Sequence, residues 1–79
     1  MKLEELLEKI KANNVPERWY AINDGVKPGA CVILDSNGQW EGFCIDEKGE
    51  RSHFNFFLNP EGAYDWLWEK MKLQLEVFG

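Results

Sequence analysis

The chain has 79 residues, of which 44% are hydrophobic and 14% aromatic, and its formal net charge is −5. This length predicts a single domain, residues 1–79, whose small core depends on the large buried area of aromatic side chains. The acidic charge argues against direct nucleic-acid binding, which needs a basic surface, and is compatible with a basic protein partner or with ordinary solubility.

The N-terminal segment predicts an amphipathic helix. From Leu3 to Ile10, leucine and isoleucine recur at helical spacing and form one apolar stripe, with Lys and Glu on the opposite side. Pro16 lies beyond its expected end. Because the stripe is short and the polar side carries both signs of charge, we expect this helix to pack on the core rather than on a membrane.

Four strands are expected next. Asn37-Gly38 is the strongest hairpin signal in the chain, and Lys48-Gly49 marks a second tight turn. Together with the turn residues that follow the first strand, these signals predict a four-stranded antiparallel meander. The strands are expected at residues 19–23, 30–35, 39–46 and 50–58.

A second helix is expected after the fourth strand. Asn59 suits the N-cap, Pro60 the first helical position, and Glu61 the positive end of the helix dipole. The order of elements predicts an α+β fold with both helices on one face of the sheet. The apolar residues that repeat at helical spacing are Tyr64, Leu67, Trp68, Met71 and Leu75.

The tight turns also predict the strand register. Two-residue loops place Cys31 opposite Cys44, Cys44 opposite His53, and Asp46 opposite Arg51. Alternation along the strands then sorts the side chains onto an apolar face, expected to be the core, and a half-polar outer face typical of contact surfaces. The expected core face carries Val32, Leu34, Phe43, Ile45, Phe54 and Phe56. The expected outer face carries Cys31, Ile33, Trp40, Cys44, Asp46, Arg51, His53, Asn55 and Phe57.

Cys31, Cys44 and His53 align in one row in this register, and four interpretations are open. A zinc site would need a fourth ligand, for which Asp46 is the nearest acid. A cross-strand disulfide between the two cysteines is geometrically conceivable. A nucleophilic Cys–His pair lacks an orienting group. The simplest interpretation is two reduced thiols beside a surface histidine.

Other signs of catalysis or targeting are weak. With one histidine and no glycine-rich phosphate loop, we expect no catalytic residue, no metal and no cofactor, and hence no enzyme. The Met1 end carries charge instead of an apolar signal segment, and no apolar run approaches the about 20 residues that cross a bilayer. We therefore expect a cytoplasmic protein without membrane association.

A series of short segments runs through most of the chain. These are Asn14-Val15-Pro16 with Trp19-Tyr20-Ala21-Ile22, then Gly38-Gln39-Trp40-Glu41 leading into Glu47-Lys48-Gly49-Glu50-Arg51, then Phe57-x-x-Pro60-Glu61-x-Ala63-Tyr64. The series resembles a group of small bacterial immunity proteins that neutralise cognate toxins of polymorphic or contact-dependent inhibition systems. The chain departs from that group's pattern at Lys48, at Gly42 to Cys44, and at Tyr64, where the group has Arg, aromatic residues and Cys.

The resemblance implies that the partner is a toxin, often a nuclease and therefore basic. Carboxylates that imitate phosphates would speed the encounter and block the substrate cleft, while aromatic and arginine side chains would anchor the contact. Trp40 has an alternative role in the peripheral core. The candidate contact residues are Asp35, Trp40, Glu41, Asp46, Glu47, Glu50, Arg51, His53 and Phe57. The alternative function is another protein-interaction or regulatory module of the same fold, and we expect a monomer or weak dimer.

Overall fold

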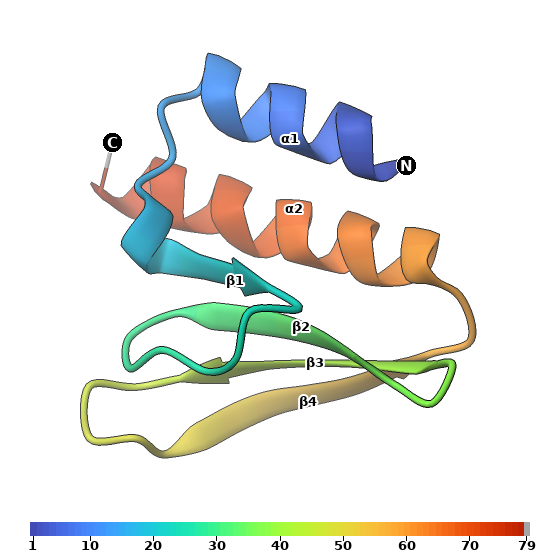
Figure 1. Ribbon diagram of the computed structural model, residues 1–79. Helices are drawn as coiled ribbons and strands as arrows, with labels where there is room; N and C mark the ends of the chain where they lie inside the picture. Colours follow the sequence, from blue (N-terminus) through green and yellow to red (C-terminus); the bar gives the residue numbers. More distant parts are fainter. Residues whose placement is uncertain (79) are drawn as a thin grey trace.

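The computed structural model describes residues 1–78 and confirms the α+β class: two helices lie with an open four-stranded sheet (Figure 1). The strands are in the order β1-β2-β3-β4. The elements are α1 (Leu3–Ala12), a 3₁₀ turn η1 (Glu17–Trp19), β1 (Tyr20–Ile22), β2 (Cys31–Ser36), β3 (Gln39–Ile45), β4 (Arg51–Phe57) and α2 (Pro60–Phe78).

The sheet is mixed, so the expected meander is wrong at its first connection. β1 pairs with β2 in parallel, whereas the other two pairings are antiparallel. Residues 23–30 contain two turns, and Asn23 and Gly29 each adopt a positive φ. Two successive reversals restore the original chain direction, which is why β2 runs alongside β1. The Lys27 ammonium supports this connection by donating to the carbonyl oxygens of Glu17 and Tyr20, each at 3.1 Å.

The β2–β3 hairpin has the predicted register. Asn37 and Gly38 form its two-residue loop with φ of 54° and 85°, and Ser36 pairs with Gln39. Positive φ at both loop positions is the requirement that makes Asn-Gly so favourable there. The same register places Cys31 opposite Cys44, as expected.

The β3–β4 turn is longer than predicted, and a bulge compensates for the difference. The Asp46 amide donates to the Glu50 carbonyl at 2.9 Å, so three residues rather than two form the loop. Consequently Cys44 pairs with Ser52 instead of His53, and Ile45 rather than Asp46 faces Arg51.

His53, with φ of 59°, is the extra residue of a β-bulge. Beyond it, Gly42 faces Asn55 and Trp40 faces Phe57, as predicted, because one extra loop residue and one extra strand residue cancel.

Both helices lie on the same side of the sheet, with α2 in direct contact with β2, β3 and β4 and α1 packed against α2 (Figure 1). Asn59 caps α2 as expected, because its Oδ1 accepts from the Gly62 amide at 2.9 Å. The buried residues between these layers are Leu6, Ile10, Val15, Cys31, Ile33, Trp40, Ala63, Tyr64, Leu67 and Met71.

The assignment of the two sheet faces is therefore wrong: α2 covers the face expected to be outer. Gly42 gives the physical reason, since a Cβ at this position would lie 2.8 Å from Cζ3 of the Trp66 ring. The missing side chain lets α2 approach β3 closely on the side of Trp40 and Phe57. Apolar alternation alone does not say which of two apolar faces receives the helices.

The opposite face of the sheet, here called the open face, carries a smaller cluster. Val32 and Phe43 are fully buried there, beside Ala30 from the β1–β2 connection. Towards β4 the side chains of this face are no longer buried: Phe54 is 57% exposed and Phe56 is 64% exposed. On the open face, the side chains of β2 are thus mostly buried and those of β4 are exposed.

Candidate partner-binding surface

Two of the expected aromatic anchors belong to the core. Trp40 is only 7% exposed and meets Tyr64 edge to face, with ring centroids 5.6 Å apart. Burial raises the pKa of the Tyr64 hydroxyl above its ordinary value. Phe57 is half-buried against Trp66, at 6.0 Å between ring centroids. Trp40 thus occupies the core, which was its alternative role, and Phe57 is only partly exposed.

Arg51 lies on the open face. Its guanidinium carbon stands 4.8 Å from the centroid of the Phe43 ring, a cation–π distance. The bulge at His53 moves Arg51 to this face by shifting the first part of β4 by one residue. Arg51 therefore borders the exposed phenylalanines rather than pairing with Asp46.

The candidate carboxylates separate into two groups at opposite ends of the sheet (Figure 1). Asp35 belongs to the β2–β3 hairpin, where its Oδ1 accepts from the Gly38 amide at 3.0 Å. Asp46, Glu47 and Glu50 form the β3–β4 turn, which we call the acidic turn, and all three are exposed. Glu41 lies between the groups, on the open face and opposite Phe56.

The Asp46 carboxylate shapes the acidic turn from inside. Its Oδ1 accepts from the Lys48 amide at 2.9 Å and from the Glu50 amide at 2.8 Å. These bonds satisfy backbone donors that the three-residue loop leaves outside the sheet ladder. Glu47 and Glu50 make no such bonds within residues 1–78, so their carboxylates are available to a partner.

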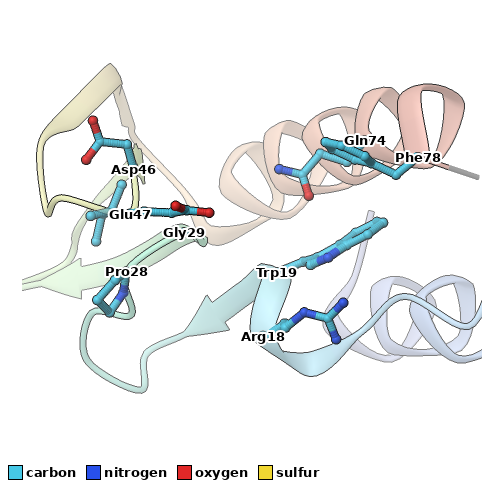
Figure 2. A pocket seen from close by; sticks show the side chains of 9 residues that line it. Arg18, Trp19, Pro28, Gly29, Asp46, Glu47, Gln74 and Phe78 are labelled. Atoms are coloured by element: carbon cyan, nitrogen blue, oxygen red, sulfur yellow. The ribbon is translucent and has the colours of Figure 1, made fainter.

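A cleft of about 460 Å³ adjoins the acidic turn (Figure 2). The Glu47 carboxylate lies on one side of the cleft, and Trp19 and Phe78, with ring centroids 6.1 Å apart, lie on the other (Figure 2). Asp46 also lines the cleft, but its carboxylate points away from the two rings (Figure 2). Arg18 lines the same cleft, but no ion pair within residues 1–78 joins it to either carboxylate. Aromatic π-faces opposite a carboxylate suit a cationic side chain, since both sides of the cleft attract positive charge.

Of the four interpretations of the row of cysteines and histidine, the structure shows the cross-strand disulfide. Cys31 and Cys44 form a disulfide, so the expectation of reduced thiols is wrong for this structure, as are the zinc and nucleophile alternatives. Among the described residues, no set of three or more His, Cys, Asp or Glu side chains is arranged to hold a metal ion. His53 is exposed, and its Nδ1 lies 3.0 Å from Ser52 Oγ.

The sequence prediction missed Phe54 and Phe56 as surface residues because it placed them in the core. Gly42 is the signal that could have corrected this, since a glycine inside a strand marks a close approach from one side. Leu58, which follows β4, is 96% exposed and extends the apolar surface. The exposed apolar strip therefore consists of Phe54, Phe56 and Leu58.

Comparison with known proteins adds no relative: no family model, no curated protein and no solved structure matches the chain. None of the helices described for residues 1–78 has the length and apolarity that crossing a membrane requires.

Proposed function

We propose that this protein is an immunity-type inhibitor that binds and neutralises a basic bacterial toxin, with the acidic turn as its main electrostatic contact. The observation that carries the proposal is the cleft in which the Glu47 carboxylate lies on one side and the Trp19 and Phe78 rings lie on the other (Figure 2). A lysine or arginine of the partner would meet the Glu47 carboxylate on one side and aromatic faces on the other.

The distribution of charge supports a basic partner. The chain has a formal net charge of −5, and the acidic turn concentrates three carboxylates beside a single lysine, Lys48. Complementary charge raises the association rate more than it raises the final affinity. The similarity of three segments to immunity proteins agrees with this role and motivates the choice of a toxin as the partner.

The proposal locates the inhibition in the cytoplasm, where a nuclease toxin would act. Because a reducing cytosol opposes disulfides, the Cys31–Cys44 bond makes this part testable. Cells are lysed into an alkylating reagent and the modified cysteines are counted by mass spectrometry. Alkylation of both cysteines supports a reducing compartment, whereas an intact disulfide points to an oxidising one.

The functional test uses the product of the open reading frame directly upstream. Expressed alone, a toxin from that frame should stop growth; co-expressed with this chain, it should be tolerated and should co-purify in a complex. Continued growth arrest together with absence of a complex would contradict the proposal for that partner.

Charge reversal then tests the acidic turn. Glu47→Lys with Glu50→Lys should lower the association rate about tenfold at low salt, and less at high salt, because exposed charges are screened. Glu5→Lys with Glu8→Lys is the matched control, since it changes net charge equally at exposed positions of α1. Equal loss of rate in both double variants would show that net charge alone, and not the turn, attracts the toxin.

A further inference from the structure

β1 and β4 are the two edge strands of the sheet, and within residues 1–78 the seven-residue β4 pairs only with β3. Unpaired strand edges expose backbone donors and acceptors, and natural proteins usually protect them with charges, proline or bulges. Here the bulge at His53 distorts only the first part of the strand. From Asn55 to Phe57 the pairing with β3 is regular.

The hydrogen-bond pattern identifies the backbone groups that point outwards. The Ile45 amide bonds to Ala30, towards β2, whereas the Asp46 amide bonds to Glu50, towards β4. Even-numbered residues of β3 therefore bond to β4, which turns the backbone groups of Asn55 and Phe57 inwards. The N–H and C=O groups of Phe54 and Phe56 face away from the sheet.

The side chains along this edge carry almost no charge. Ser52 to Pro60 is the longest stretch of the chain without Asp, Glu, Lys or Arg. If two identical chains paired along this edge about a two-fold axis, residues close to the axis would lie near their own counterparts, and like charges there would repel each other. The absence of charge makes this edge compatible with an identical edge, despite the net charge of −5 on each chain.

We propose that the occupant of this edge is a second copy of the chain, paired antiparallel along β4. When the two-fold axis passes through Asn55, the outward N–H and C=O groups of Phe54 can form hydrogen bonds with those of Phe56 in the second copy. This register places Phe54 beside Phe56 of the second copy on the open face, twice by symmetry. Asn55 meets its own copy: its Nδ2 donates to the His53 carbonyl oxygen at 3.2 Å, and the second N–H and the Oδ1 of the amide can bond to the identical amide.

The same register is favourable at its ends. Because His53 is an extra residue in the strand, Arg51 comes opposite Leu58 of the second copy, and the 96% exposed Leu58 side chain can pack on the alkyl part of Arg51 where the phenylalanine pairs end. The two sheets join into one, and the helices of both copies lie on the same side. The paired segment is short compared with the about 1,200–2,000 Å² that stable complexes bury, so the dimer dissociates in the micromolar range or above.

The first experiment is sedimentation velocity over protein concentrations from about 1 μM to about 1 mM. The wild-type chain should shift from monomer to dimer, and Phe56→Lys should stay monomeric throughout. This variant keeps the fold because Phe56 is 64% exposed and a lysine there would face Glu41. Val77→Lys, at an exposed position of α2, is the control and should dimerise like wild type.

A covalent trap tests the register. Asn55→Cys should oxidise rapidly to a cross-linked dimer, since the two thiols meet at the axis as a non-hydrogen-bonded pair. Ser36→Cys, at the exposed β2–β3 turn, should not.

A chain that remains monomeric up to about 1 mM would overturn the proposal and leave the edge to a strand of another protein. A dimer that Phe56→Lys does not weaken would overturn it equally. Neither outcome bears on toxin neutralisation, which the acidic turn is proposed to serve.

Discussion

On the face of the sheet that α2 covers, Trp40 is buried and Phe57 is half-buried against helix side chains; on the open face, Phe54 and Phe56 have similar chemistry and remain largely exposed. On both faces the side chains alternate along the strands as expected, and both faces carry enough apolar side chains to form a core. The difference comes from Gly42, which admits the Trp66 ring on one side only. Which face becomes the core thus depends on where a helix can approach closely, and not on hydrophobicity alone.

The largest expected effect separates the two faces by stability. Trp40→Ala should lower the free energy of unfolding by about 3–5 kcal/mol, because it removes a buried ring and leaves a cavity. Phe56→Ala should cost less than about 1 kcal/mol, since its ring is already exposed. Urea denaturation of both variants measures the contrast. Similar losses would mean that the open face is covered in solution.

The disulfide gives the next largest effect. It links two cysteines 13 positions apart, and a closed loop of this size contributes about 3 kcal/mol to the free energy of unfolding. Reduction should lower the urea midpoint of the wild-type protein by a corresponding amount. The double variant Cys31→Ala with Cys44→Ala should show no response to reductant. An unchanged wild-type midpoint would show that the bond contributes nothing to stability.

Gly42→Ala tests the close approach itself. The added methyl group meets Trp66, so we expect a loss of about 1–3 kcal/mol in the free energy of unfolding. Trp66→Leu should make room, and the loss due to Gly42→Ala should then shrink in that background. Additive losses in a double-mutant cycle would show that the two residues do not contact.

The smallest expected effect lies in the acidic turn. Asp46→Ala should lower the free energy of unfolding by about 1 kcal/mol, because two backbone amides lose their acceptor. Asp46→Asn keeps an acceptor oxygen, so its free energy of unfolding should stay close to that of the wild-type protein. Glu47→Ala should leave thermal stability unchanged. If all three variants unfold at the wild-type temperature, the carboxylate does not stabilise the turn.

Local signals predicted most of the elements. Asn37-Gly38 set the first hairpin, and Asn59 with Pro60 began α2 where expected. Two features depend on tertiary context. The parallel β1–β2 pairing results from two turns in one loop, and the bulge at His53 places a non-glycine residue at positive φ inside a strand. Neither has a strong local pattern, because tertiary packing and not propensity stabilises it.

For the candidate site, the sequence located the exposed carboxylates but not the aromatic surface. Turn residues such as Glu47 and Glu50 are exposed whichever sheet face is buried, so the wrong assignment of the two faces did not affect the prediction of their exposure. Trp40 and Phe57 exchanged places with Phe54 and Phe56, because choosing a face assigns every side chain of a strand at once. The cleft beside Trp19 joins segments distant in sequence, and composition carries no signal for it.

Residue-resolved amide hydrogen exchange tests the arrangement of β4 most directly. In dilute solution the amides of Phe54 and Phe56 should exchange rapidly, and those of Asn55 and Phe57 slowly, since only the latter bond to β3. Raising the protein concentration should slow exchange at Phe54 and Phe56 alone. Uniform protection along β4 in dilute solution, or rapid exchange at Asn55 and Phe57, would contradict a sheet whose free edge and open face are those of β4.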